Sequence, residues 1–329
     1  MAPVLSIVIP CFNEEEVLPE TARAVRGKLA ELVQSGRLSD ASFICFVDDG
    51  SRDKTWSIIK DLSTGGSIVG IKLAHNAGHQ KALIAGLMYS KDHSDCVISM
   101  DADLQDDIDV IDEFIEAYSE GCKIVYGARR DRSRDAFFKR FTAEFFYKVM
   151  KAMGVELVFN HADYRLVDSA VLHHLEEYQE THLFLRGIFP AMGFTSRIVY
   201  YDRKARLAGN TKYPLKKQIA FALEGIASFS VKPLKLVTWI GMIVFILCSV
   251  MGVYTFWQKF TGNSVPGWAS NMLSIYFLGS VQILSLGVIG EYIGKIYEEV
   301  KRRPRYIIED IAAPAFKEAK VGQNSVFEA

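Results

Sequence analysis

Short apolar runs alternate with longer stretches of helical periodicity over residues 1–130. A brief run rich in Val, Ile and Phe between polar residues is typical of a buried strand, and the intervening stretches are long enough for crossover helices. This alternation predicts a doubly wound, mostly parallel α/β sheet. The predicted strands are residues 5–9, 43–47, 68–73, 96–100 and 123–126.

Two long stretches near the C-terminus, residues 237–257 and 272–290, contain no charged residue. Each is close to the ~20 residues with which a helix crosses ~30 Å of hydrocarbon. A buried hairpin in a globular domain is the alternative, but a helix that is apolar on every face has no ordinary place in a domain of this size. The sequence therefore predicts two transmembrane helices joined by a turn over residues 260–271, which contain Gly262, Pro266 and Gly267.

Basic residues flank the predicted hairpin on one side. The only charged residue near the turn is Lys259, just before it, and by the positive-inside rule both chain ends are then cytoplasmic. Residues 1–6 lack the basic start of a signal peptide. We expect a multi-pass protein of the inner (cytoplasmic) membrane with its catalytic or binding domain in the cytosol. The flanking basic residues are Lys232, Lys235, Lys295, Lys301, Arg302, Arg303 and Arg305.

These patterns divide the chain into four parts. Residues 1–213 form the α/β domain, 214–235 an amphipathic juxtamembrane region, 236–294 the two membrane helices, and 295–329 a cytoplasmic tail with a short β-like run at 306–308. The 329 residues are 50% hydrophobic, with 38 basic and 39 acidic side chains, so the chain can bury a full core. Its five cysteines include no Cys-x-x-Cys pair, which indicates reduced thiols and excludes a small disulfide scaffold.

Polar clusters follow three of the predicted strands. Ligands of open α/β sheets bind outside the carboxyl ends of the strands, so these clusters are candidate site residues. Three acidic groups on one rim would repel each other, and a divalent cation between them is the simple answer. The clusters are Pro10, Phe12, Asn13 and Glu14 after the first strand, Asp48, Asp49, Gly50 and Ser51 after the second, and Asp101, Asp103 and Gln105 after the fourth.

Asp101 and Asp103 are the candidate ligands of that cation, because Mg²⁺ and Mn²⁺ prefer oxygen ligands and share their coordination with substrate phosphates. The alternative is that these are solvated turn residues or helix caps, a role that suits Asp106, Asp107 and Asp109 in the first turn of the next helix. Asn13 and Ser51 are equally compatible with helix capping.

Other nucleotide and metal sites find little support. No Gly-x-Gly-x-x-Gly follows the first strand, and the glycine spacing of residues 65–70 has Ile71 where a P-loop has lysine. His75 and His79 are four residues apart but lack a third ligand nearby, so zinc is not expected.

Two basic, amphipathic segments point to a membrane surface. Residues 129–140 contain six basic and two acidic residues, and residues 203–235 contain eight basic residues. Such segments bind anionic headgroups or nucleic acid. A chain already anchored in lipid meets lipid phosphates first, so no nucleic-acid partner is expected. The first segment carries Arg129, Arg130, Arg132, Arg134, Lys139 and Arg140.

Five motifs in a fixed order give a more specific indication. They are residues 10–14 (PCFNE), 48–51 (DDGS), 76–78 (NAG), 101–105 (DADLQ) and 209–213 (GNTKY), ahead of the two apolar stretches. The chain resembles glycosyltransferase family 2 over residues 5–308, and within it the polyprenyl-phosphate glycosyltransferases, the group of dolichol-phosphate mannose synthase and the bacterial bactoprenol glucosyltransferases. Asn210 and Thr211 before Lys-Tyr, and Phe12 in place of Tyr, depart from the usual pattern without removing a charge.

The resemblance implies a GT-A fold and a role for each matching residue. Asp101, Asp103 and Gln105 would surround Mg²⁺ or Mn²⁺ on the donor diphosphate, and Arg206 and Lys212 would close over it. Independently of the resemblance, the basic membrane-surface pattern of residues 129–140 makes Arg129, Arg132 and Arg140 the candidates for binding the acceptor phosphate. Asp163 and Arg165 are secondary candidates for the sugar or acceptor pocket, with a structural ion pair as the alternative. The donor-binding residues implied are Pro10, Phe12, Asn13, Glu14, Asp48, Asp49 and Asp101.

The activity implied is an inverting transfer of a sugar from a nucleotide-sugar to polyprenyl phosphate on the cytosolic leaflet. The expected donor is UDP-glucose and the expected acceptor is undecaprenyl phosphate. The alternative is a mannosyltransferase that uses GDP-mannose. A homo-oligomer is compatible with the sequence. An acceptor phosphate is already a nucleophile, so no catalytic base is required. A non-catalytic membrane-tethered scaffold is a rival from another class. A processive polysaccharide synthase is not favoured, because the sequence has no Gln-x-x-Arg-Trp motif. A transporter is not favoured either, because the two spans have no charged residue apart from the terminal Glu291 and so cannot line a path for a substrate.

Overall fold

The computed structural model describes residues 2–130, 161–181, 183–202, 232–261 and 267–313. The chain divides into two units, which we describe separately. One comprises Met1–Phe145, Glu156–Lys212 and Pro304–Ala329, and the other Phe146–Val155 and Tyr213–Arg303.

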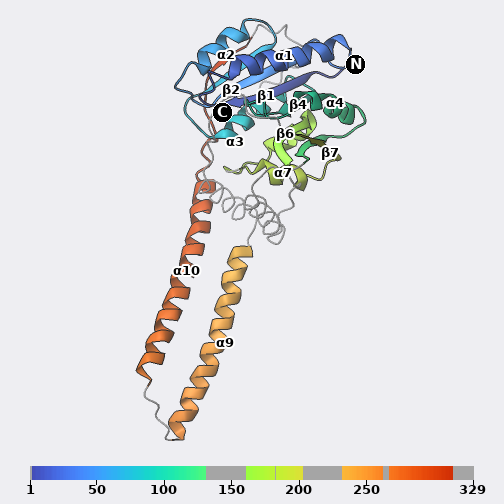
Figure 1. Cartoon of the computed structure of the whole chain (residues 1–329). Helices are drawn as coiled ribbons and strands as arrows, with labels where there is room; N and C mark the ends of the chain where they lie inside the picture. The colour runs from blue at the N-terminus through green and yellow to red at the C-terminus, as the bar shows by residue number, and fades with distance from the viewer. Residues whose placement is uncertain (1, 131–160, 182, 203–231, 262–266, 314–329) are drawn as a thin grey trace, which may run out of the picture. The chain divides into compact units, whose positions relative to one another are not determined.

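Strands of the first unit form one sheet in the order β7-β5-β6-β4-β1-β2-β3-β8 among the described residues (Figure 1). Neighbouring pairs β1/β2, β1/β4, β2/β3 and β5/β7 are parallel, whereas β6 and β8 run against their neighbours. The mostly parallel α/β sheet predicted from the sequence is therefore confirmed. The strands are β1 Leu5–Cys11, β2 Phe43–Asp48, β3 Ile68–Leu73, β4 Cys96–Ser99, β5 Ile124–Arg129, β6 His161–Asp168, β7 Ser196–Tyr201 and β8 Ile308–Ala312.

Helices connect these strands as the alternating pattern requires. They are α1 Leu18–Gln34, α2 Thr55–Ser63, α3 His79–Ser90, the short η1 Ile108–Val110, α4 Ile111–Ser119, α6 Ser169–Glu176 and α7 Leu185–Ala191. Helix α3 approaches β1 closely, since a Cβ on Gly86 would lie 2.3 Å from Cγ1 of Val8. Any side chain larger than hydrogen at position 86 would push α3 away from the sheet.

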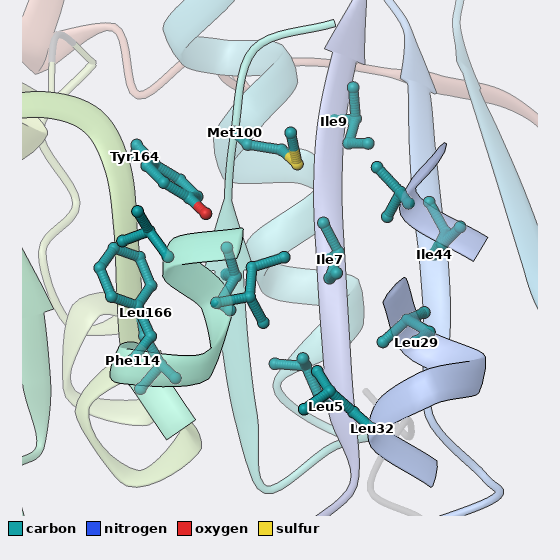
Figure 2. Close-up of a cluster of buried hydrophobic side chains, with 14 of the residues drawn as sticks. Leu5, Ile7, Ile9, Leu29, Leu32, Ile44, Met100, Phe114, Tyr164 and Leu166 are labelled. Carbon is teal, nitrogen blue, oxygen red and sulfur yellow. The ribbon is translucent and has the colours of Figure 1, made fainter. Parts of the chain in front are cut away.

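The core lies between the sheet and the helices that carry its apolar faces. Alternate residues of a strand point to one side, so Leu5, Ile7 and Ile9 of β1 share a face. Figure 2 shows these residues next to side chains from α1, α4 and β6, and all are buried. The neighbours that Figure 2 labels are Leu29, Leu32, Ile44, Met100, Phe114, Tyr164 and Leu166.

Two strands, β6 and β7, were not predicted from the sequence. The β6 sequence, HADYRLVD, carries charged residues at positions 163 and 165, which hides the apolar pattern of a buried strand. Both charges are tolerated because each is the partner of the other.

The C-terminal β-like run was predicted at residues 306–308, but the strand is β8, Ile308–Ala312. It pairs antiparallel with β3, and the amide of Ala74 donates to the carbonyl of Ile307. The free edge of β3, rather than local apolarity, decides where this strand lies.

The second unit contains α9, Lys232–Phe260, and α10, Trp268–Val300, which contact each other. Within the described residues, Phe277–Val300 is the one segment that is long and apolar enough to cross a membrane. It begins and ends later than the predicted span at 272–290, and a second span within α9 stays a prediction. Large apolar side chains are nevertheless exposed on both helices, with Trp239 68% and Ile283 73% exposed.

Candidate active site at the carboxyl end of the sheet

The loops after β1 and β2 are tied together by Asn13. Its amide donates to Oγ of Ser51 (2.9 Å), and its Oδ1 accepts from the amide of Arg52 (2.9 Å). Asn13 has a φ of 53°, a left-handed conformation that asparagine tolerates better than most residues. Asn13 and Ser51 therefore link two loops of the candidate site, and helix capping is not their observed role.

Asp48 and Asp49 are adjacent but differ in what their carboxylates do. Asp48 is fully buried; its Oδ1 accepts from the amide of Ser51 (3.1 Å), and its Oδ2 has no partner among the described residues. Burial raises the pKa of Asp48, although the bonds from Ser51 act against this. A buried, unpaired carboxylate oxygen is costly, so Asp48 is suited to accept a hydrogen bond from a bound ligand.

Asp49 holds the loop after β3. Its two oxygens accept from the amides of Ala77 (2.7 Å) and Gly78 (3.0 Å). Burial raises the pKa of Asp49 and these two bonds lower it. Its role as a donor-binding residue stays a prediction, since both oxygens already serve the backbone.

Gly50 lets the loops after β2 and β3 meet. Its φ is +67°, and a Cβ here would lie 2.7 Å from the amide nitrogen of Asn76 and from the carbonyl carbon of His75. The motifs at 48–51 and 76–78 are therefore in contact. Pro10 lies within β1, and Phe12 just beyond it is 37% exposed. The amide of Glu14 donates to Oγ1 of Thr55 (2.9 Å).

Asp101 and Asp103 lie in the loop after β4. Thr21 of α1 anchors this loop by donating to the carbonyl of Ala102 (2.7 Å), and the amide of Gln105 donates to Oδ1 of Asp103 (3.2 Å). The Asp101 side chain is 39% exposed, so it can reach a ligand.

The donor set of this loop fits a hard cation that shares its coordination with a substrate. No group of three His, Cys, Asp or Glu residues within the described ranges could hold a metal ion without further ligands. Two carboxylates supply only part of the six or so oxygens that Mg²⁺ requires, and diphosphate oxygens would supply others. The oxygen groups of Asp101, Asp103 and Gln105 are of the type that Mg²⁺ or Mn²⁺ takes up together with a nucleoside diphosphate, and their role as metal ligands stays a prediction.

Asp106 is buried and feels the charges of Asp101 and Asp103, whereas sequence analysis considered it suited to the first turn of a helix. That assignment is wrong for Asp106, which is 3% exposed and accepts from the hydroxyl of Tyr201 (2.5 Å). Arg129 at the end of β5 is 3.9 Å away. The partners of Asp106 thus come from β7 (Tyr201) and β5 (Arg129), and no local sequence pattern reveals these contacts. Asp107 does cap η1, by accepting from the amide of Asp109.

The pKa of Asp106 is raised to about 6, first by burial and then by the charge of Asp101, while Tyr201 and Arg129 act against the shift. Because this pKa lies above the unfolded value, the folded state binds the proton more tightly. The contribution of Asp106 to the free energy of unfolding is therefore complete below about pH 4. About 3 kcal/mol of this contribution is lost as the pH rises through about 6.

We expect Asp106→Asn to reduce this loss of stability, since the asparagine has no proton to release and its Oδ1 still accepts from Tyr201. Urea unfolding of the detergent-solubilised chain between about pH 4 and pH 6.5 measures the slope. Equal slopes for the variant and the wild type would show that Asp106 titrates normally.

Asp163 and Arg165 of β6 form a buried ion pair that α7 completes. Arg165 is 1% exposed, lies over the ring of Phe189 and donates from Nη2 to Oδ1 of Asp163. Arg186 donates two hydrogen bonds to the same carboxylate, from Nη2 to Oδ2 (2.9 Å) and from Nε to Oδ1 (3.2 Å). Burial alone would raise the pKa of Asp163, but Arg186 and Arg165 hold it well below its usual range. The geometry favours the ion pair that sequence analysis left open for these two residues.

The remaining cationic candidates divide by location. Arg129 is described, and its side chain is 24% exposed. Arg132 and Arg140 lie within residues 131–160, and Arg206 and Lys212 within residues 203–231, outside the described ranges. Their roles stay predictions. Sequence reasoning missed Asp106, Tyr201 and Arg186, whose contacts depend on strand and helix packing.

Comparisons with known proteins agree with the five motifs. Glycosyl transferase family 2 matches residues 6–176, and the GtrB C-terminal hairpin matches residues 232–296. The uncharacterized glycosyltransferase YkoT of Bacillus subtilis is 54% identical over 308 residues, 93% of this chain and 91% of its own length.

Two further relatives carry names that specify an activity. A prophage bactoprenol glucosyl transferase homolog of Escherichia coli is 40% identical, covering 93% of this chain and 99% of its own. Bactoprenol glucosyl transferase of Shigella phage SfII is also 40% identical, covering 93% and 97%. With the mostly parallel α/β sheet of a GT-A-like fold and the acidic loop after β4, these matches show that the chain belongs to glycosyltransferase family 2.

Proposed function

We propose that the protein transfers a hexose, with glucose as first choice, from a nucleotide-sugar to polyprenyl phosphate. The acidic loop after β4 carries this proposal, because Asp101 and Asp103 lie on the same rim of the sheet as the unpaired oxygen of Asp48. Asp101 and Asp103 are suited to bind a diphosphate through its cation. Asp48 is suited to accept a hydrogen bond from the base or ribose. The names of the bactoprenol glucosyl transferase relatives support the lipid acceptor and the sugar.

The reaction proposed is a single in-line displacement at C1 of the sugar. A phosphate oxygen of the acceptor forms the new bond to C1 as the bond to the donor diphosphate breaks, which inverts the anomeric configuration. Mg²⁺ or Mn²⁺, when bound by Asp101 and Asp103, would neutralise the charge that grows on the leaving diphosphate. Asp163 is not suited to act as a base, because two arginines already bind its carboxylate.

A panel of donors tests this function. We expect nucleotide release from UDP-glucose, in detergent with Mg²⁺ or Mn²⁺, to depend on added undecaprenyl phosphate and to exceed release from UDP-galactose, UDP-N-acetylglucosamine and GDP-mannose. A preference for GDP-mannose would instead identify a mannosyltransferase. Release from no donor under any condition would support the non-catalytic scaffold.

Arg129 is the described residue that we propose for the acceptor phosphate. Arg129→Ala is expected to raise KM for undecaprenyl phosphate about tenfold to a hundredfold, as for the loss of a charge-assisted hydrogen bond, with little change in donor affinity. Arg129→Lys should recover only part of the loss, because lysine lacks the two-pronged guanidinium. Steady-state kinetics with each substrate varied in turn measures both effects.

The control is Arg197→Ala, which removes an exposed arginine of β7 paired with Glu120. It should leave both KM values unchanged. Lys212→Ala, by contrast, should raise the donor KM or lower kcat. Equal damage to both substrates in the Arg129 and Lys212 variants would mean that one basic cluster serves both phosphates.

We also propose that α9 and α10 both span the inner membrane, with the catalytic unit and both chain ends in the cytosol. The match to the GtrB C-terminal hairpin and the exposed apolar side chains of both helices support this topology. A cysteine at Thr261, after α9, should react in intact cells with an impermeant thiol reagent, and one at Lys301, after α10, should not. The wild-type chain gives the background. Labelling only at Lys301 would mean that the topology is the reverse of the one proposed. The candidate site would then have no access to cytosolic nucleotide-sugars.

A further inference from the structure

His79 is the first residue of α3, and its position is fixed by the loop before it. Gly78 has a φ of +97°, and the amides of Ala77 and Gly78 both donate to Asp49. The start of α3 is therefore fastened to the carboxyl end of β2. The backbone of His79 is therefore held close to the candidate site, and the imidazole can still rotate about its side-chain bonds.

The imidazole of His79 lies between two carboxylates. Its Nε2 is 3.7 Å from Oδ1 of Asp101 and 3.9 Å from Oδ2 of Asp163, and the side chain is 32% exposed. These distances are too long for hydrogen bonds but are within reach of a small rotation. Catalytic hydrogen bonds are often long without substrate and shorten when it binds.

The two carboxylates differ in their freedom. Asp163 is held by Arg165 and Arg186 and is 13% exposed, so its position is determined. Asp101 is 39% exposed, and Nε2 of His79 lies 3.7 Å from its Oδ1. Of the two, Asp101 is the group whose orientation a contact from His79 can set.

We propose that His79 is a positioning residue for Asp101. When a nucleoside diphosphate and a divalent cation are bound, Nε2–H donates to one carboxylate oxygen of Asp101 and leaves the other oxygen for the cation. This rests on the proposed donor site. A histidine suits this task because its neutral ring still donates one hydrogen bond, whereas a lysine would add a full positive charge beside the cation.

Replacements of His79 with different reach test the proposal. In His79→Gln the side-chain nitrogen lies close to the place of Nε2, whereas His79→Asn is too short and His79→Ala has no donor. The matched control is His75→Ala, which truncates an exposed histidine four residues earlier in the same segment. Thermal unfolding midpoints of all four variants check the fold.

The measurement is UDP binding by calorimetry with the full chain in detergent, once with Mn²⁺ and once in EDTA, so that it does not depend on turnover. We expect Mn²⁺ to strengthen UDP binding to the wild type. The Ala and Asn variants should bind UDP in the presence of Mn²⁺ about 10- to 100-fold more weakly, the usual effect of removing a hydrogen bond to a metal-binding carboxylate. His79→Gln should retain most of the affinity, and binding in EDTA should be the same for all.

Three results would overturn the proposal. They are wild-type affinity of His79→Ala with Mn²⁺, equal losses in the Gln and Ala variants, and a loss in EDTA as large as that with Mn²⁺, which would mean that His79 contacts the nucleotide directly. The wild type separates this inference from the proposed function. If neither UDP nor GDP binds to it in a Mn²⁺-dependent way, the donor site itself is wrong.

Discussion

Asp103→Asn is expected to lower kcat/KM for sugar transfer by about 10²- to 10³-fold, the effect of removing one charged group that stabilises the leaving diphosphate. The substitution keeps the shape of the side chain, and its Oδ1 can still accept from the amide of Gln105. It removes a negative charge that a hard cation requires. The fold should therefore remain while activity is lost. Steady-state transfer rates with saturating Mn²⁺ and the thermal unfolding midpoint measure the two effects.

Asp109→Asn is the matched control, because Asp109 is 77% exposed and lies six residues further along the chain. It should keep wild-type activity. EDTA added to the wild type should reproduce the loss seen in Asp103→Asn, and excess Mn²⁺ should restore only the wild type. If Asp103→Asn turns over at nearly the wild-type rate, Asp103 has no part in binding the cation.

Asp163→Asn is expected to lower the free energy of unfolding by about 3–5 kcal/mol, the usual cost of removing one partner from a buried ion pair. Arg165 would lose the carboxylate while remaining 1% exposed. Its Nε and Nη1 already lack hydrogen-bond partners among the described residues, so no substitute is at hand. Arg186 is 34% exposed and can turn to water, so most of the cost comes from Arg165. Urea unfolding near pH 7 measures the change.

The double variant Asp163→Asn/Arg165→Met separates the charge effect from a packing effect. Methionine has a similar length, packs against Phe189 and leaves no buried charge. We therefore expect the double variant to be more stable than Asp163→Asn alone. A double variant that is less stable than Asp163→Asn would show that Arg165 stabilises the fold independently of Asp163.

The architecture could largely be predicted from the sequence where local pattern and tertiary environment agree. Strands β1 to β4 are almost wholly buried, so each is a mostly apolar run between polar loops, with Ser6 and Lys72 as interruptions. The clusters that follow β1, β2 and β4 could be placed on one rim because parallel strands bring their carboxyl ends together. The acidic loop and the Asn13 to Ser51 contact both follow from this rule.

What escaped prediction depends on contacts between distant parts of the chain. The charges of β6 conceal a buried strand because each is neutralised by another charged residue, one of them on α7. From the sequence, Asp106 has the position of a helix-capping residue. In the structure it accepts a hydrogen bond from Tyr201 of β7 and lies 3.9 Å from Arg129 of β5. The two histidines of residues 75–79 suggested at most a weak zinc motif, whereas His79 faces two carboxylates.

The most direct test of the account is the chemical identity of the product. The full chain in detergent, given UDP-glucose labelled in the sugar, undecaprenyl phosphate and Mn²⁺, should move the label into an organic-extractable lipid. Mass spectrometry should then give the mass of undecaprenyl phosphate plus one hexose, and NMR should show a β-linked sugar from the α-linked donor. Label recovered only as free glucose, or a lipid product with retained α configuration, would contradict single-displacement transfer to the lipid phosphate.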